Sequence, residues 1–341
     1  MEFRRFIRAV VYAAVASMLS IAVARANFND KKPITYTVDG ATATGYFKVV
    51  TEAINGVIRD AYPGSAATYK PGSPAGGIQN IAIGQADFSF TGGAPEIAYA
   101  LEGKAPFQQS LKGKFSFVML LHNDLVVYNI ATKEWADKNG IKSFDDIASK
   151  KPQMRLTVNQ LANLQSTLSM SVAIFDAFGI KEEDVTGKGG AIFRSNTAGG
   201  LDALRDGKVD VLINGSFVPA AEVTDLARGR PLIWISGDPA KMKVAADRWG
   251  YDTVIVPKSA YSFMTQDETT LTLWTAVVAG THVSDETVYK FMKALVDNKD
   301  RVRGIHPSLD KFSIDTIKRN PTPLPYHPGA ERFYREADVL K

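Results

Sequence analysis

The chain has 341 residues, 45% of them hydrophobic and 22% charged, which is the composition of a globular protein long enough for two lobes of ordinary domain size. Of its 40 basic and 36 acidic residues, four Arg and one Glu lie in the first 26 positions, which leaves 36 and 35. Such a nearly neutral chain gives no reason to expect nucleic-acid binding. The absence of cysteine excludes disulfides, zinc–thiolate sites and thiol catalysis.

The first 26 residues are predicted to be a signal peptide. Met1–Arg8 is basic, Ala9–Ala24 is apolar but short for a membrane span, and Ala24-Arg25-Ala26 has the small–x–small pattern of a cleavage site. We expect cleavage near Ala26/Asn27 and a periplasmic mature protein, with an uncleaved anchor as the alternative. No later stretch approaches the roughly 20 apolar residues that span a bilayer.

The mature chain is predicted to begin with a strand, a polar loop and a helix. Pro33–Val38 alternates like a strand, Asp39–Gly45 is a loop of small residues, and Tyr46–Ala61 has apolar residues at helical spacing. The start of this helix offers unpaired N–H groups that suit a carboxylate or phosphate. The plainer alternative is that Thr44 only caps the helix. Ala66–Tyr69 follows as a second, weak strand.

One segment of the chain occurs twice. Ser73–Gly93 (SPAGGIQNIAIGQADFSFTGG) matches Asn196–Ser216 (NTAGGLDALRDGKVDVLINGS) at a constant offset, which aligns Gly84 with Gly207 and Asp87 with Asp210. Each copy predicts a short helix, a glycine turn and a buried strand that ends in a polar loop. We expect the two aspartates to fix the turn before the strand. A repeated unit indicates two similar lobes with a ligand cleft between them.

The segments around the second copy repeat the order of the first lobe. Phe115–Leu121 and Leu125–Ile130 are predicted to be two strands, of which the second crosses into lobe two. Both lobes then have the order β-loop-α-β-α-β-loop, and Thr253–Val256 and Leu271–Val278 return the chain to lobe one. The predicted boundaries are 27–125 and 255–341 for lobe one, with the C-terminal helices, and 126–254 for lobe two. The second-lobe elements are Met154–Val158, Thr167–Phe178, Ala191–Arg194 and Val209–Ile213.

Residues that would indicate an enzyme or a metal site are missing from the pattern. No nucleophile elbow, phosphate-binding loop or dinucleotide fingerprint occurs, and no pair of acids stands out as general acid and base. The four scattered histidines, His122, His282, His306 and His327, lack metal-ligand spacing, so we expect structural roles for them. We therefore predict a binding protein without catalytic residues, metal or cofactor.

Several short motifs resemble the TAXI family, the solute receptors of tripartite ATP-independent periplasmic (TRAP) transporters. Gly84–Asp87 is similar to the family's Gly-Glu-Ala-Asp turn, and Leu204–Asp210 to its Leu-x-Asp-Gly-x-x-Asp turn. The most specific match is Pro325–Glu336 (PYHPGAERFYRE), which we expect to be structural. The polar loops Gly40–Phe47 and Asn163–Thr167 depart from the family pattern. The resemblance implies carboxylate ligands such as glutamate or 2-oxoglutarate.

These observations predict an α/β, two-lobed, type II periplasmic-binding-protein fold that captures a small, carboxylate-bearing ligand and delivers it to a TRAP permease. Alternatives are a receptor of an ABC importer, a sensor component for a two-component kinase, and a hydrolase or transferase. We expect a monomer whose partners are the ligand and the permease subunits. Tyr251 or Trp274 is a candidate cover for an apolar part of the ligand. The predicted ligand contacts come from both lobes: Thr42, Thr44, Tyr46, Ser73, Thr91, Gly92, Gln165, Ser166, Thr167, Asn214 and Ser216.

Overall fold

The strands of the described residues form one mixed sheet. The computed structural model describes residues 28, 30–41, 46–159 and 166–341. Within them, ten strands lie in the order β2-β1-β3-β10-β4-β7-β5-β6, with β8 on β4 and β9 on β10. Their bounds are β1 Thr35–Ala41, β2 Ala66–Pro71, β3 Phe88–Gly92, β4 Phe115–Thr132, β5 Arg155–Val158, β6 Ala191–Arg194, β7 Val211–Ser216, β8 Leu232–Trp234, β9 Asp252–Val256 and β10 Glu268–Gly280.

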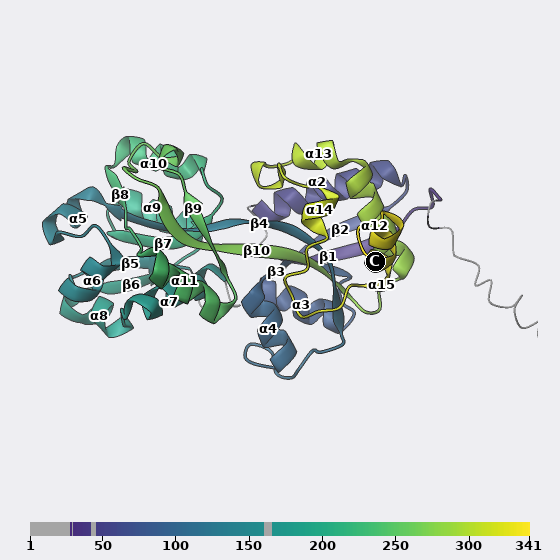
Figure 1. Ribbon diagram of the computed structural model, residues 1–341, viewed down its shortest axis with the longest axis horizontal. Coiled ribbons are helices and arrows are strands. Elements are labelled where there is room, and N and C mark those ends of the chain that lie inside the picture. Colours follow the sequence, from purple (N-terminus) through teal and green to yellow (C-terminus); the bar gives the residue numbers. More distant parts are fainter. Residues whose placement is uncertain (1–27, 29, 42–45, 160–165) are drawn as a thin grey trace, which may run out of the picture. The chain divides into compact units, whose positions relative to one another are not determined.

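Helices flank both ends of this sheet (Figure 1). Their bounds are α2 Tyr46–Ala61, α3 Pro74–Ala82, α4 Ala94–Glu102, α5 Lys133–Asn139, α6 Phe144–Lys150, α7 Ser166–Phe178, α8 Glu182–Thr186, α9 Thr197–Arg205, α10 Ala221–Gly229, α11 Pro239–Trp249, α12 Asp285–Asp297, α13 Lys299–Arg303, α14 Ile314–Ile317 and α15 Pro328–Glu336, with short 3-10 turns η1 Gly187–Gly189, η2 Lys258–Ala260 and η3 Pro307–Leu309. No helix of the described residues is long and apolar enough to cross a membrane. The predicted signal peptide, residues 1–26, lies outside the described residues.

The sheet consists of two equivalent groups of strands. In the first half, β1 lies between β2 and β3, all three are parallel, and β10 follows antiparallel on β3. In the second half, β5 lies between β6 and β7, again parallel, and β4 follows antiparallel on β7. We call these groups, with the helices that cover them, the first half and the second half. The C-terminal helices belong to the first half, since the Arg301 guanidinium on α13 bonds to the Asp60 carboxylate on α2 at 2.6 Å.

This topology confirms the repeated order of elements and the fold class predicted from sequence. Residues 33–341 form one compact unit, within which both halves lie. The predicted lobe boundaries therefore stay a prediction. Figure 1 shows β4 and β10 running through both groups of strands, and β10 returns the chain to the first half as expected.

The side chains at the end of β4 point alternately into two separate hydrophobic cores of the second half. Val126, Tyr128 and Ile130 pack with α9 and α10, whereas Val127 and Ala131 face the core under α6, α7 and α11. Successive strand residues point to opposite faces, so a strand covered on both faces is expected to be apolar at nearly every position. This explains why the end of β4 is mostly apolar. Its buried exception, Asn129, donates to Thr270 Oγ1 at 3.1 Å.

The structure joins two predicted strands into one. Phe115–Leu121 and Leu125–Ile130 are parts of the single 18-residue strand β4, so the prediction of two strands is wrong. The polar sequence His122-Asn123-Asp124 suggests a break, yet β4 stays paired with β10 on both sides of it. Pairing with a neighbouring strand satisfies the backbone at this point and overrides the local preference.

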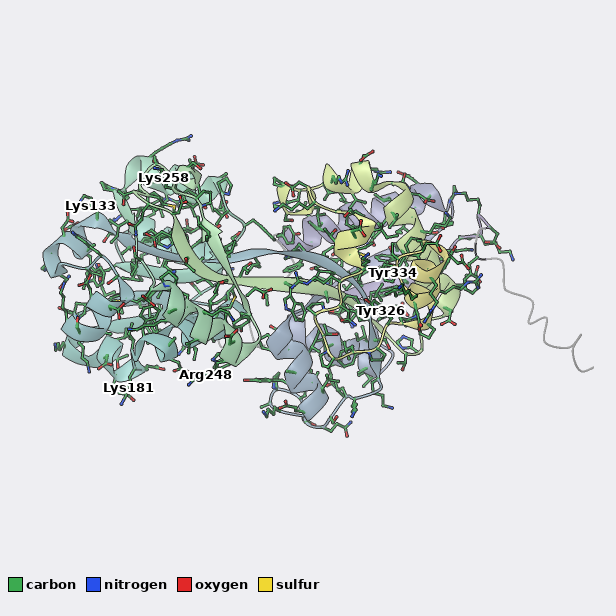
Figure 2. The ribbon with its side chains drawn as sticks, in the orientation of Figure 1. Lys133, Lys181, Arg248, Lys258, Tyr326 and Tyr334 are labelled. Atoms are coloured by element: carbon green, nitrogen blue, oxygen red, sulfur yellow. The ribbon has the colours of Figure 1, made fainter. Side chains whose placement is uncertain are left out.

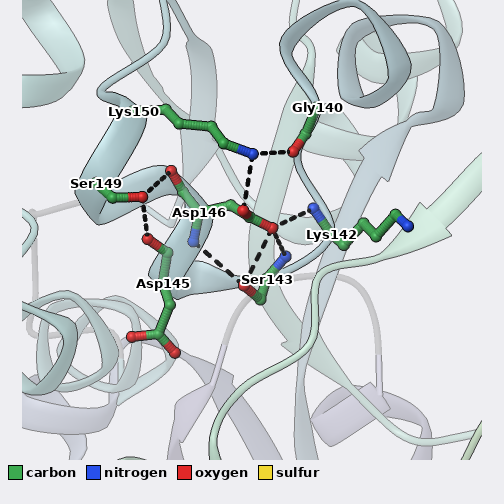
Figure 3. A network of polar contacts seen from close by, with 7 residues as sticks. All are labelled: Gly140, Lys142, Ser143, Asp145, Asp146, Ser149 and Lys150. Atoms are coloured by element: carbon green, nitrogen blue, oxygen red, sulfur yellow. Dashed lines mark hydrogen bonds and ion pairs between the residues drawn. The ribbon is translucent and has the colours of Figure 1, made fainter.

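The start of the short helix α6 is where the sequence predicts it. The sequence Ser143-Phe144-Asp145-Asp146 predicts a helix start, and α6 begins there with a capping box (Figure 3). Ser143 Oγ accepts the N–H of Asp146 at 3.2 Å, and the Asp146 carboxylate accepts the N–H of Ser143 at 3.2 Å. A bond to Lys150 and the backbone N–H of Lys142 lower the pKa of Asp146 to about 2.

The C-terminal motif is structural, as expected. Tyr334 on α15 is buried, and its hydroxyl lies 3.2 Å from the carbonyl of Val118 on β4 and 2.9 Å from that of Ile317. Tyr326 packs edge-on against both Phe117 and Tyr334. Figure 2 labels Tyr326 and Tyr334, which lie near each other in the first half. The motif therefore fastens the end of the chain to β4.

The repeated aspartates occupy equivalent positions in the two halves. The Asp87 carboxylate accepts the N–H of Thr37 on β1 at 2.7 Å, and Asp210 accepts the N–H of Arg155 on β5 at 3.1 Å. In return, the N–H groups of Asp87 and Asp210 donate to the carbonyls of those same residues. Both aspartates thus tie the turn before the third strand to the first strand of their half, which confirms the predicted role.

We expect Asp210→Ala to lower the free energy of unfolding by about 2 kcal/mol, because it leaves the backbone N–H of Arg155 and part of its guanidinium without their acceptor. Urea unfolding followed by circular dichroism measures the change. The matched control is Asp206→Ala, which removes only a surface pair with Lys208 and should change little. Equal losses in both variants would contradict the assigned role.

Candidate functional site

The structure describes only part of the predicted ligand contacts. Thr42, Thr44 and Gln165 lie outside the described residues. Thr91 and Gly92 end β3, where Gly92 pairs with Ala276 of β10, and Ser166 begins α7. Tyr46, Ser73, Thr167, Asn214 and Ser216 are described with their side chains.

One of the predicted contacts, Ser73, has a structural role in the structure. Its Oγ accepts the N–H of Gly76 at 3.1 Å and caps α3, whose first residue is Pro74. Asn196 does the same for α9 through the N–H of Gly199 at 2.8 Å. The two copies of the repeat therefore begin with the same kind of helix cap.

Thr167 and Asn214 are brought together in a buried network at the ends of β5 and β7. Asn159 bridges them, with its amide donating to Thr167 Oγ1 at 2.5 Å and to Asn214 Oδ1 at 3.2 Å. Asn214 Oδ1 also accepts from Thr197 Oγ1 at 3.2 Å and from the N–H of Gly215 at 2.9 Å. Asn214 is fully buried, so this network fixes the loop geometry of the second half. Ser216, the last residue of β7, lies opposite Val126 of β4.

Tyr46 belongs to a group of rings that joins the two halves. Its ring centroid lies 4.2 Å from that of Phe217, which follows β7, and 5.5 Å from that of His122 on β4. His122 lies 5.0 Å from Phe217, and His306 lies 4.8 Å from Tyr46 and 5.1 Å from Phe217. Phe47 completes the group. We call these five residues the aromatic cluster.

Hydrogen bonds hold the rings of the cluster from both sides. The Tyr128 hydroxyl donates to the carbonyl of Phe217 at 2.6 Å. Tyr46 Oη lies 2.6 Å from Ser308 Oγ, which in turn lies 3.0 Å from Nδ1 of His306. The N–H of Ser308 also donates to that nitrogen, so Nδ1 of His306 is an acceptor. Tyr46 is thus positioned by the C-terminal part of the first half.

His122 is the exception in this cluster, because neither of its ring nitrogens has a hydrogen-bond partner among the described residues. The side chain is only 4% exposed. Burial, and to a lesser extent the nearby His306, lower the pKa of His122 to about 3, so its imidazole is neutral. Burial also lowers the pKa of His306. A buried polar group without a partner is unfavourable for folding and suggests a functional reason for its retention.

A cavity of about 540 Å³ lies beside the cluster and takes its walls from both halves. His122 and Ser308 line it together with Lys243 of α11 from the second half and Lys311 and Arg319 from the first. None of the five predicted contacts described with their side chains lines it, although Tyr46 reaches its wall through Ser308. Tyr251, a predicted cover residue, does line this cavity.

A second cavity of about 530 Å³ is lined by the other predicted cover residue, Trp274, with Tyr99, Arg248 and Trp249. The wall of this second cavity is more apolar than that of the first and includes Pro321 and Pro323. Within the described parts of the chain, no group of three or more His, Asp or Glu residues is placed to hold a metal ion.

The fold of this chain is similar to those of several solved structures. The chain matches 91% of its length to the structure of PhnD1 from Prochlorococcus marinus (MIT 9301) in complex with methylphosphonate, at 10% identity and a TM-score of 0.52, and covers all of that chain. Lactococcal OpuAC in complex with glycine betaine is 11% identical with a TM-score of 0.46. The match covers 89% of this chain and 96% of OpuAC. SsuA from Methylobacillus flagellatus KT, a periplasmic sulfonate-binding protein, is 13% identical with a TM-score of 0.43. The match covers 90% of this chain and 86% of SsuA.

The fold is therefore that of the type II periplasmic binding proteins. Residues 39–337 match the model of the NMT1-like family, and the chain belongs to this family.

We expect His122→Phe to leave the free energy of unfolding unchanged or to raise it by about 1 kcal/mol at neutral pH, because it removes two unpaired buried nitrogens but keeps a ring in the cluster. Thermal and urea unfolding measure it. His327→Phe is the matched control: this buried histidine caps α15 through the N–H of Gly329 at 3.2 Å, so its loss should cost about 1 kcal/mol. Similar destabilisation in both variants would mean that His122 has a structural partner.

The same variant tests the protonation state of His122. Because an unfolded histidine binds a proton near pH 6.5 and the folded pKa is about 3, acid favours the unfolded state between these values. The wild type should lose stability relative to His122→Phe by up to about 1.4 kcal/mol per pH unit as the pH falls through this window. Urea unfolding at pH 7, 5.5 and 4 measures the difference, and parallel curves would contradict a lowered pKa.

Proposed function

We propose that this chain is a receptor that binds one small solute between its two halves and passes it to a membrane transport system. The observation that carries the proposal is a cavity with walls from both halves, beside a ring contact that joins them. Its volume of about 540 Å³ lies in the usual range for small-ligand pockets, roughly 300–1,000 Å³. The binding-protein fold and the absence of catalytic motifs from the sequence agree with a receptor rather than an enzyme.

The proposed mechanism is capture by closure. β4 and β10 are the strands of the described sheet that extend through both halves, so bending them would move one half against the other. Closure would bring Tyr46 of the first half against Phe217 of the second, and opening would separate these rings. A ligand that contacts both halves favours the closed form by its greater affinity for that form.

The ligand is proposed to be a small organic anion. The sequence predicts an anion site at the helix starts and strand ends, at Thr42, Thr44 and Tyr46 in one half and at Gln165, Ser166 and Thr167 in the other. Ser73, Thr91, Gly92, Asn214 and Ser216 complete that proposed set. For Ser73, Thr167 and Asn214, hydrogen bonds within their own half support a role in shaping these loops rather than a direct ligand contact.

The comparisons favour an ABC importer as the transport partner over a TRAP permease. The structures of similar fold include one described as a glycine betaine/carnitine/choline ABC transporter and the periplasmic sulfonate-binding protein SsuA of a putative sulfonate ABC transporter. The resemblance to the TAXI family keeps TRAP delivery as the second candidate. Uptake of the labelled solute into membrane vesicles that contain the receptor separates the two, since only the ABC importer requires ATP.

A thermal-shift screen of the mature chain, from Asn27 onward, tests the receptor proposal. A solute that binds only the folded protein must stabilise it, by about 2.7 kcal/mol at a hundredfold excess over its dissociation constant. The panel holds dicarboxylates, amino acids, phosphonates, sulfonates, betaines and sugars. A saturable shift with one chemical class and no turnover of the compound supports a receptor. Turnover of the bound compound would instead indicate a hydrolase or transferase.

A further inference from the structure

The second cavity, of about 530 Å³, also takes its walls from both halves, and its wall is mainly apolar. The first half contributes α4, Trp274 of β10 and the segment 321–323, and the second half contributes the last turn of α11 and the glycine that follows it. Aromatic rings and prolines make up most of this wall: Tyr99, Trp249, Trp274, Pro95, Pro321 and Pro323. Such a wall suits a flat apolar molecule of small-ligand size.

The aromatic side chains present apolar surface to this cavity. The only polar atom of the Trp249 side chain, Nε1, is buried and has no hydrogen-bond partner among the described residues, so the part of this side chain that lines the cavity is carbon. Tyr99 and Trp249 are both half-buried. A ligand in the cavity would therefore remove further aromatic surface from water, which favours binding.

Among the described residues that line this cavity, Arg248 is the only charged one. It is exposed in the last turn of α11 and forms no ion pair within the described part of the chain. Glu96 lies beside the cavity on α4 but is fully buried and is not part of the wall. A guanidinium matches the planar, bidentate geometry of a carboxylate, and no carboxylate of this wall competes for it.

We propose that the second cavity is a binding site for a small aromatic carboxylate, separate from the proposed solute cavity. The ring of the ligand packs among Tyr99, Trp249 and Trp274, and its carboxylate pairs with Arg248. This inference goes beyond the proposed receptor function and does not depend on it. Both features are needed for the assignment, because the rings alone would accept a neutral compound, and Arg248 alone would only complement the C-terminal dipole of α11.

The last turn of α11 lines both cavities. Ala246 and Asp247 belong to the wall of the first cavity, and Arg248 and Trp249 to the wall of the second. A ligand that contacts both halves favours the arrangement in which both contacts are made. An aromatic carboxylate in the second cavity would therefore act on the same closure movement as the transported solute, from a different site.

Isothermal titration calorimetry on the mature protein tests the inference with phenylacetate and three matched probes. Phenylacetamide lacks the charge, cyclohexylacetate lacks the aromatic ring, and acetate lacks both the ring and its apolar surface. Tryptophan emission is a second readout, since two of the four tryptophans line this cavity.

The variants are Arg248→Met from the second half and Tyr99→Leu from the first. Lys311→Met is a control in the first cavity. Lys258→Met is a control for charge alone: Lys258 is exposed, forms no ion pair among the described residues, and lies on the opposite side of the second half from Arg248 (Figure 2).

We expect phenylacetate to bind about 3- to 10-fold more tightly than phenylacetamide or cyclohexylacetate, and acetate to give no saturable heat. Arg248→Met and Tyr99→Leu should each weaken phenylacetate by about 3- to 10-fold, and Arg248→Met should also abolish the preference over phenylacetamide. Lys311→Met and Lys258→Met should change the affinity less than about twofold. Emission should change with the same dissociation constant, and the melting temperature of each variant without ligand excludes unfolding as the reason for lost binding.

Three outcomes would overturn the inference, and each leaves the proposed receptor function intact. Absence of saturable heat and of an emission change with phenylacetate would refute the site. Equal affinity for phenylacetate and phenylacetamide would refute the carboxylate class. Weakening by Lys311→Met, but not by Arg248→Met or Tyr99→Leu, would place the ligand in the first cavity.

Discussion

The antiparallel pairing of β4 with β10 is the constraint on which the rest of the structure depends. These strands carry the chain from one half to the other, and each also completes the sheet of a half, β10 beside β3 and β4 beside β7. The register between them is irregular at Thr275, directly opposite His122. Irregular pairing bends strands and redirects side chains. The place where the halves are joined is thus also the place where the sheet is least regular.

Much of the fold was predictable because each half obeys the same local rules. The repeat predicts a helix, a positive-φ glycine and a strand, and Gly84 and Gly207 adopt φ of 76° and 72° in the two copies. α2 has the predicted bounds, and α6 begins at the predicted serine cap. These signals act within a few residues of the chain, so a single sequence displays them.

The candidate site was less predictable because its residues meet only through tertiary structure. Tyr46 and Phe217 are 171 positions apart in the chain and touch only when both halves are in place. His122 was expected to be structural, since a lone histidine in an apolar strand usually has a partner in the core. The signal that it differs is present in the sequence: His122 begins the polar step that interrupts an apolar run. That step was interpreted as a break between strands, although β4 continues through it.

Packing alone does not explain the unpaired imidazole of His122. Phenylalanine would fill an aromatic cluster without the penalty of two desolvated nitrogens, and the neighbours Phe47 and Phe217 show that phenylalanine is used there. A local choice that opposes stability, at the wall of a cavity shared by two halves, is where functional residues are expected. The buried Asn214 shows the contrast: its amide oxygen has three donors, and it serves the framework. A fully satisfied amide thus marks a residue of the framework, whereas His122 belongs, with the Tyr251 hydroxyl and Asn129 Oδ1, to the buried polar groups whose atoms lack a partner among the described residues.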